Sequence, residues 1–75
     1  MSLSTKADLS ARMLICNLTL KNLLTQIKAI ENNTQLSTDN KLIEIKKIQE
    51  EIKKVGTEID IVKKEIRLLR ASHLN

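Results

Sequence analysis

An unbroken heptad pattern of aliphatic residues in the second half of the chain most constrains its fold. The spacing between successive members alternates between 3 and 4, and the members are Ile45, Ile48, Ile52, Val55, Ile59, Val62, Ile66 and Leu69. This pattern is typical of the a and d positions of a left-handed coiled coil, with Ile45 at a. Because a straight helix has 3.6 residues per turn, such a stripe stays against a partner only if the helices supercoil. The pattern therefore predicts a helix that packs on at least one other helix.

A second stripe of the same kind occupies the first half of the chain. Its members are Leu9, Met13, Cys16, Leu20, Leu23, Ile27 and Ile30, with Met13 at a. Further apolar residues fall on the opposite side of this helix, namely Ala11, Leu14, Ile15 and Leu18. A helix that is apolar on more than one side needs burial on more than one side. We therefore expect this helix to be the inner element of a bundle of three or more helices.

The polar stretch 31–40 separates the two stripes and leaves two architectures open. Its Asn, Thr, Ser and Asp side chains compete for backbone hydrogen bonds and favour turns and caps. In the first architecture, helices over 6–31 and 39–71 flank a turn at 32–38 and form an antiparallel hairpin. The alternative is one continuous helix in a parallel dimer or trimer, with the interruption acting as a stutter. The clustering of turn-forming residues favours the hairpin, and all of 1–75 is assigned to a single coiled-coil domain.

Capping residues support helix starts at both predicted positions. Thr5, followed three residues later by Asp8, fits a capping box at the start of the first helix. Thr38 or Asp39 is predicted to cap the second helix.

Charged residues beside the second stripe predict how copies of this helix are oriented. Glu58 and Glu65 fall at position g, whereas Lys63 and Arg70 fall at position e. In a parallel pair, g of one helix meets the following e of its neighbour, so each glutamate faces a cation. An antiparallel pair of the same helix would instead bring glutamates together. The pattern predicts that copies of the second helix run parallel to each other.

Two other features of the second helix each have two interpretations. Ile61 and Leu68 lie at position c, outside the stripe, and form either a second contact strip or tolerated surface aliphatics. Gly56, at position e, costs about 1 kcal/mol relative to alanine in a helix interior. This glycine either permits a close approach or is tolerated.

Composition favours association and excludes most enzymatic chemistry. A chain of 75 residues with a single cysteine forms no internal disulfide, and cores of this size supply only about 3–5 kcal/mol. One histidine and one cysteine, with no Gly-rich loop, provide no catalytic set and no metal or cofactor site. The sequence therefore predicts a protein that is not an enzyme, with no cofactor and no small-molecule substrate.

The predicted function is an oligomerisation or protein–protein interaction module, a scaffold or tether subunit of a larger complex. Its partners would be other copies of itself, other coiled-coil subunits, or both. The alternative, suggested by a net charge of +4, is a basic helical module that contacts nucleic acid or an anionic membrane surface. Interleaved acidic residues and the absence of aromatic residues argue against that alternative. Without a secretory signal or a spanning segment, we expect an intracellular location, in the cytoplasm or nucleus.

Overall fold

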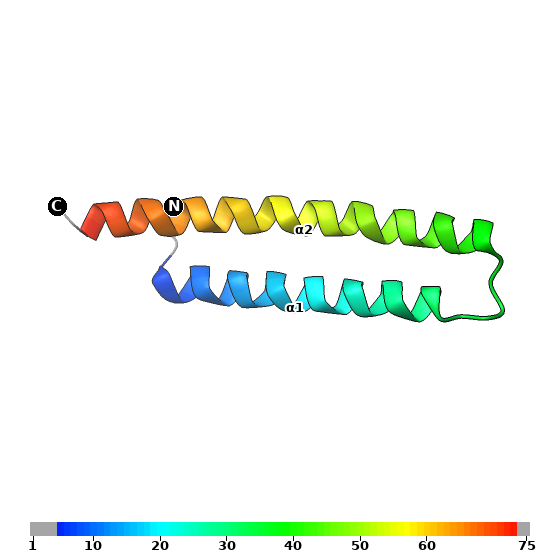
Figure 1. Ribbon diagram of the computed structural model, residues 1–75. Coiled ribbons are helices and arrows are strands. Elements are labelled where there is room, and N and C mark those ends of the chain that lie inside the picture. Colours follow the sequence, from blue (N-terminus) through cyan, green and yellow to red (C-terminus); the bar gives the residue numbers. More distant parts are fainter. Residues whose placement is uncertain (1–4, 74–75) are drawn as a thin grey trace.

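Two antiparallel helices make up the part of the chain described by the computed structural model, residues 5–73 (Figure 1). Helix α1 spans Lys6–Glu31 and helix α2 spans Thr38–His73. The chain reverses direction between them, so the hairpin interpretation is confirmed and the continuous helix is wrong. The described residues contain no strand.

The start of α1 is fixed by the capping box that the sequence predicts. The Thr5 hydroxyl accepts a hydrogen bond from the backbone N–H of Asp8 at 3.1 Å, and the Asp8 carboxylate accepts one from the Thr5 N–H at 3.3 Å. Two backbone donors that have no partner within the helix are thereby satisfied. The prediction of this cap is confirmed.

The turn is held by hydrogen bonds from its own polar residues. Asn32 donates its backbone N–H to the Lys28 carbonyl at 3.0 Å, which closes the last turn of α1. The side-chain oxygen of Asn33 accepts from the Gln35 N–H at 2.9 Å. Lys41, in the first turns of α2, donates its ammonium to the Glu31 carbonyl at 3.0 Å. The turn therefore needs neither glycine nor proline, and no described residue has a positive φ.

Ser37 caps α2, one residue before the predicted cap. Its hydroxyl accepts from the Asn40 N–H at 3.2 Å, and its carbonyl accepts from the Lys41 N–H at 2.9 Å. The helix begins at Thr38, so the prediction of a cap at Thr38 or Asp39 is wrong. Ser, Thr and Asp all cap helices well, so residue type alone does not distinguish Ser37 from the two predicted caps.

The core of the hairpin is thin. Leu9, Cys16 and Val62 are its buried apolar residues, and the other members of the two stripes are half-buried. Helix α2 has 36 residues against 26 in α1, so its C-terminal turns extend past the start of α1 (Figure 1). The described molecule measures 58 × 22 × 15 Å. One thickness of 15 Å means that each helix has a neighbour on one side only.

Candidate helix-interaction surfaces

The two stripes that the sequence singles out face each other within one chain. No member of either stripe is exposed in the structure. The first stripe lies on α1 and the second on α2, so the hairpin itself gives each stripe a partner. Surfaces open to other molecules therefore lie elsewhere, on the outer sides of the helices.

The most apolar of these surfaces lies on α1. Leu14, Ile15 and Leu18, here called the α1 outer strip, are 58%, 62% and 57% exposed. They belong to the segment 13–20, which contains no charged residue. The segment nevertheless forms helix throughout, because its other apolar residues pack on α2. The structure thus leaves uncovered the second apolar side that the sequence identifies on this helix.

Helix α2 carries a smaller apolar surface at the same end of the hairpin. Ile61 and Leu68 are both exposed, so neither contributes to the contact with α1. Leu24, Leu42 and Ile43 are further exposed aliphatic residues, the last two in the first turns of α2. Single exposed aliphatics are common on protein surfaces, so the α1 outer strip is distinguished by its clustering.

Arg12 joins the two helices through a pair of ion pairs. Its Nη2 lies 2.5 Å from Oε1 of Glu58, and its Nη1 lies 3.0 Å from Oε2 of Glu65. These two glutamates sit one heptad apart at position g of α2, and Arg12 sits at position g of α1. In an antiparallel hairpin the g positions of both helices lie on the same side, so one guanidinium reaches both carboxylates.

This arrangement differs from the pairing that the sequence suggested for the two glutamates. Lys63 and Arg70 of a neighbouring copy were the predicted partners of Glu58 and Glu65, whereas the structure pairs both glutamates with Arg12 of their own chain. Comparing the g positions of the two stripes in an antiparallel arrangement would have identified Arg12. Lys63 and Arg70 are exposed on α2.

The hydrogen bond with Glu58 raises the pKa of Arg12 above its ordinary value, and partial burial opposes this shift. The Glu58 and Glu65 charges raise the pKa of Arg12 further. A group with a raised pKa stabilises the folded state fully below its unfolded-state pKa, and loses that contribution as pH rises through the folded-state pKa. Because the pKa of Arg12 lies far above neutral pH in both the folded and the unfolded state, this residue does not make the stability of the hairpin depend on pH in the neutral range.

The other two ion pairs are local to α2 and weak. Lys47 lies 3.5 Å from Glu44, and Lys54 lies 3.3 Å from Glu51, each three residues along the helix. All four side chains are largely exposed. Exposed pairs of this kind contribute about 0.2–1 kcal/mol at most, and both lie within α2, so they do not hold the two helices together.

Gly56 has open space beside it. It lies at position e in the interior of α2, and a Cβ atom placed there would meet no atom within 4 Å. Nothing in the hairpin therefore requires a glycine at this position. A close approach at Gly56, one of the two interpretations of this residue, is not made by α1.

Neither α1 nor α2, over the described residues, offers a stretch apolar enough to cross a membrane. Comparisons of the chain with protein-family models, with curated proteins and with solved structures find no significant match.

Proposed function

We propose that this hairpin is a non-enzymatic helical interaction module, an oligomerisation, scaffold or tether subunit whose core is completed by further helices in a coiled-coil bundle. The observation that carries the proposal is the α1 outer strip. It presents three large aliphatic side chains, each more than half exposed, on a helix whose opposite side already packs on α2. A helix with two apolar sides is stable in water only when both are covered.

The thin core supports this proposal. Only Leu9, Cys16 and Val62 of the described apolar residues are buried, and the remaining stripe residues are half-buried. Covering one exposed Leu or Ile side chain contributes about 1.5–3 kcal/mol. Added helices would therefore contribute stability comparable to what a single small core supplies, about 3–5 kcal/mol.

The electrostatics of the strip also suit a helical partner. Residues 13–20 carry no charge, so a helix that covers them does not desolvate an ionised group of α1. Arg12 lies just before this segment and is already paired with Glu58 and Glu65. The binding partner therefore needs only an aliphatic stripe of its own.

Ile15→Lys tests this proposal, because it places a charge in the strip without touching the contact between α1 and α2. We expect the variant to keep the circular dichroism of a helical protein while its mass in solution falls to that of one chain, 8.5 kDa. Asn22→Lys is the matched control. It adds the same charge at the same heptad position, one heptad further along α1, and Asn22 is also exposed.

The mass should be measured by sedimentation equilibrium for the wild type and both variants. An Ile15→Lys mass equal to that of an associated wild type would show that the strip is not the contact. Equal mass loss in the Asn22→Lys control would show that added charge, and not the loss of the apolar contact, caused dissociation.

A further inference from the structure

Charge is sorted between the two sides of the hairpin. Because the helices are antiparallel, positions b and e of both helices lie on one side, and positions c and g lie on the other. The b/e side, here called the basic face, carries seven cations: Lys21, Lys28, Lys46, Lys53, Lys63, Arg67 and Arg70. Its acidic residues are Glu31, Asp39 and Asp60. Each face runs along both helices and is therefore long.

The opposite side, here called the acidic face, has the reverse balance. It carries Asp8, Glu44, Glu51, Glu58 and Glu65, against the basic residues Arg12, Lys47 and Lys54. These three basic residues and the four glutamates form every ion pair found among residues 5–73.

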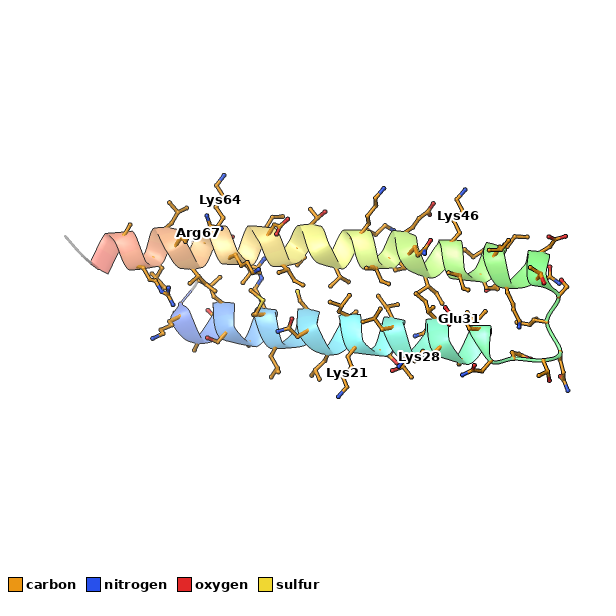
Figure 2. All side chains as sticks on the ribbon, viewed as in Figure 1. Lys21, Lys28, Glu31, Lys46, Lys64 and Arg67 are labelled. Carbon is orange, nitrogen blue, oxygen red and sulfur yellow. The ribbon has the colours of Figure 1, made fainter. Side chains whose placement is uncertain are left out.

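The cations of the basic face, in contrast, make no ion pair within the described part of the chain. In Figure 2, Lys21 of α1 and Lys46 of α2 extend away from the opposite helix. Like charges along one exposed face repel each other, and an anionic surface laid on them would relieve that repulsion. The basic face therefore lacks a negatively charged partner. The acidic face of a second copy would supply one, and it has the same length because both faces run along the same two helices.

Both faces also carry exposed aliphatic side chains. Leu14, Leu24 and Leu42 lie on the basic face, and Ile15, Ile61 and Leu68 lie on the acidic face, so the α1 outer strip reaches onto both. Gly56 lies in the middle of the basic face, and a Cβ atom placed there would meet no atom within 4 Å. Apolar contacts within a charged rim are the usual composition of an interface between proteins. They distinguish these faces from a surface that binds a polyanion through charge alone.

We infer that the acidic face of one copy docks on the basic face of a second copy, side by side, with the α2 helices parallel. This contact rests on the proposed function and names the partner as the chain itself. A parallel arrangement brings Glu58 and Glu65 of one copy to Lys63 and Arg70 of the next, the e and g pairing of parallel helices. Arg12 occupies one oxygen of each carboxylate, and the second oxygen still accepts from the neighbouring cation.

This contact is heterologous, because it joins two different faces. A pair of copies would leave one acidic and one basic face uncovered, so the assembly closes into a ring or continues as a row. In a ring and in a row alike, the α1 helices of all copies lie on the same side of the assembly, and so do their outer strips. A ring with α1 inside buries the strips at its centre, so we expect a closed assembly of more than two copies.

Charge reversal on each face separately tests the inference. The first variant, Lys46→Glu with Lys53→Glu, reverses two charges in the middle of the basic face and leaves five cations against five acidic residues on it. The second, Glu44→Lys with Glu51→Lys, makes the acidic face basic and leaves Arg12 and its partners intact. Each variant alone should sediment as a single chain of 8.5 kDa. An equimolar mixture should regain the wild-type mass or a neighbouring even number of chains, because each variant then supplies the face that the other lacks.

Three outcomes would overturn the inference. The first is that both variants keep the wild-type mass. The second is that the mixture stays monomeric although each variant shows wild-type helicity by circular dichroism. In the third, the Lys46→Glu, Lys53→Glu variant keeps its mass but loses binding to a fluorescent oligothymidine; the basic face would then be a polyanion site.

These results are separable from a failure of the proposed function. If only the inference is wrong, Ile15→Lys still dissociates the wild-type assembly while charge reversal does not. If the proposed function is wrong for self-association, the wild type is itself monomeric at millimolar concentration, and no variant changes its mass.

Discussion

At the scale of single residues, Arg12 shows what the sequence contained and what it did not reveal. The charges that flank the second stripe predict contacts between copies of the same helix, whereas Arg12, which pairs with Glu58 and Glu65, belongs to the first helix. Its two ion pairs depend on how far α1 is shifted along α2. That shift is set by the turn at 32–37, and the geometry of this turn cannot be predicted from the heptad spacing of the helices. The stripe residues needed no such information, because their spacing alone places them on one side of each helix.

Gly56 allows a prediction at the same scale. A Cβ there meets nothing within 4 Å, so Gly56→Ala should stabilise the hairpin by about 1 kcal/mol through helix propensity. The urea midpoint should be measured in the Ile15→Lys background, where association does not contribute to stability. Gln49→Ala is the control. It lies at the same heptad position one heptad earlier, and it should leave the urea midpoint nearly unchanged because Gln and Ala have similar helix propensities. A midpoint that Gly56→Ala does not raise in this background would contradict the expected gain in helix propensity.

At the scale of elements, hydrophobic periodicity and turn-forming residues were sufficient to predict two helices in a hairpin. The stretch from Asn32 to Ser37 ends one helix and starts the next without glycine or proline. Its backbone groups are satisfied by Asn33, Lys41 and Ser37. The position of the second cap was missed by one residue, because adjacent hydroxyl and carboxylate side chains have similar capping preferences.

The cap of α2 can be tested directly. Ser37→Ala removes the acceptor of the Asn40 N–H and should lower the free energy of unfolding by about 1 kcal/mol. Thr38→Ala removes a hydroxyl one residue later, inside the helix, and should change it much less. Urea titrations followed by circular dichroism at 222 nm, the standard helix signal, measure both. A larger loss for Thr38→Ala would restore the cap that the sequence predicted.

At the scale of the whole molecule, the hairpin is long, thin and covered on one side only. Its extents of 58 × 22 × 15 Å hold two layers of backbone and a single layer of side chains between them. Small chains bury a low fraction of their surface and are correspondingly marginal. The sequence identified this shortage through the two apolar sides of the first helix. It did not identify the sorting of charge into a basic and an acidic face, which appears only once α1 and α2 are placed side by side.

Ile59→Asp tests the contact on which this thin molecule depends. Ile59 is half-buried at position a of the α2 stripe, facing α1. A carboxylate there loses water without gaining a partner, because Arg12 lies at g and is occupied by Glu58 and Glu65. Since few other residues are buried, we expect the substitution to abolish helicity and association together. Ile15→Lys, in contrast, should abolish association alone.

Thr57→Asp is the control for Ile59→Asp, because it adds the same charge to α2 at an exposed position. It should retain both helicity and mass. Circular dichroism and sedimentation on the same samples separate loss of fold from loss of assembly. If Ile59→Asp retains the helicity and mass of the wild type, the α1–α2 stripe does not hold the hairpin together. The outer faces would then have to supply the stability that the stripe does not.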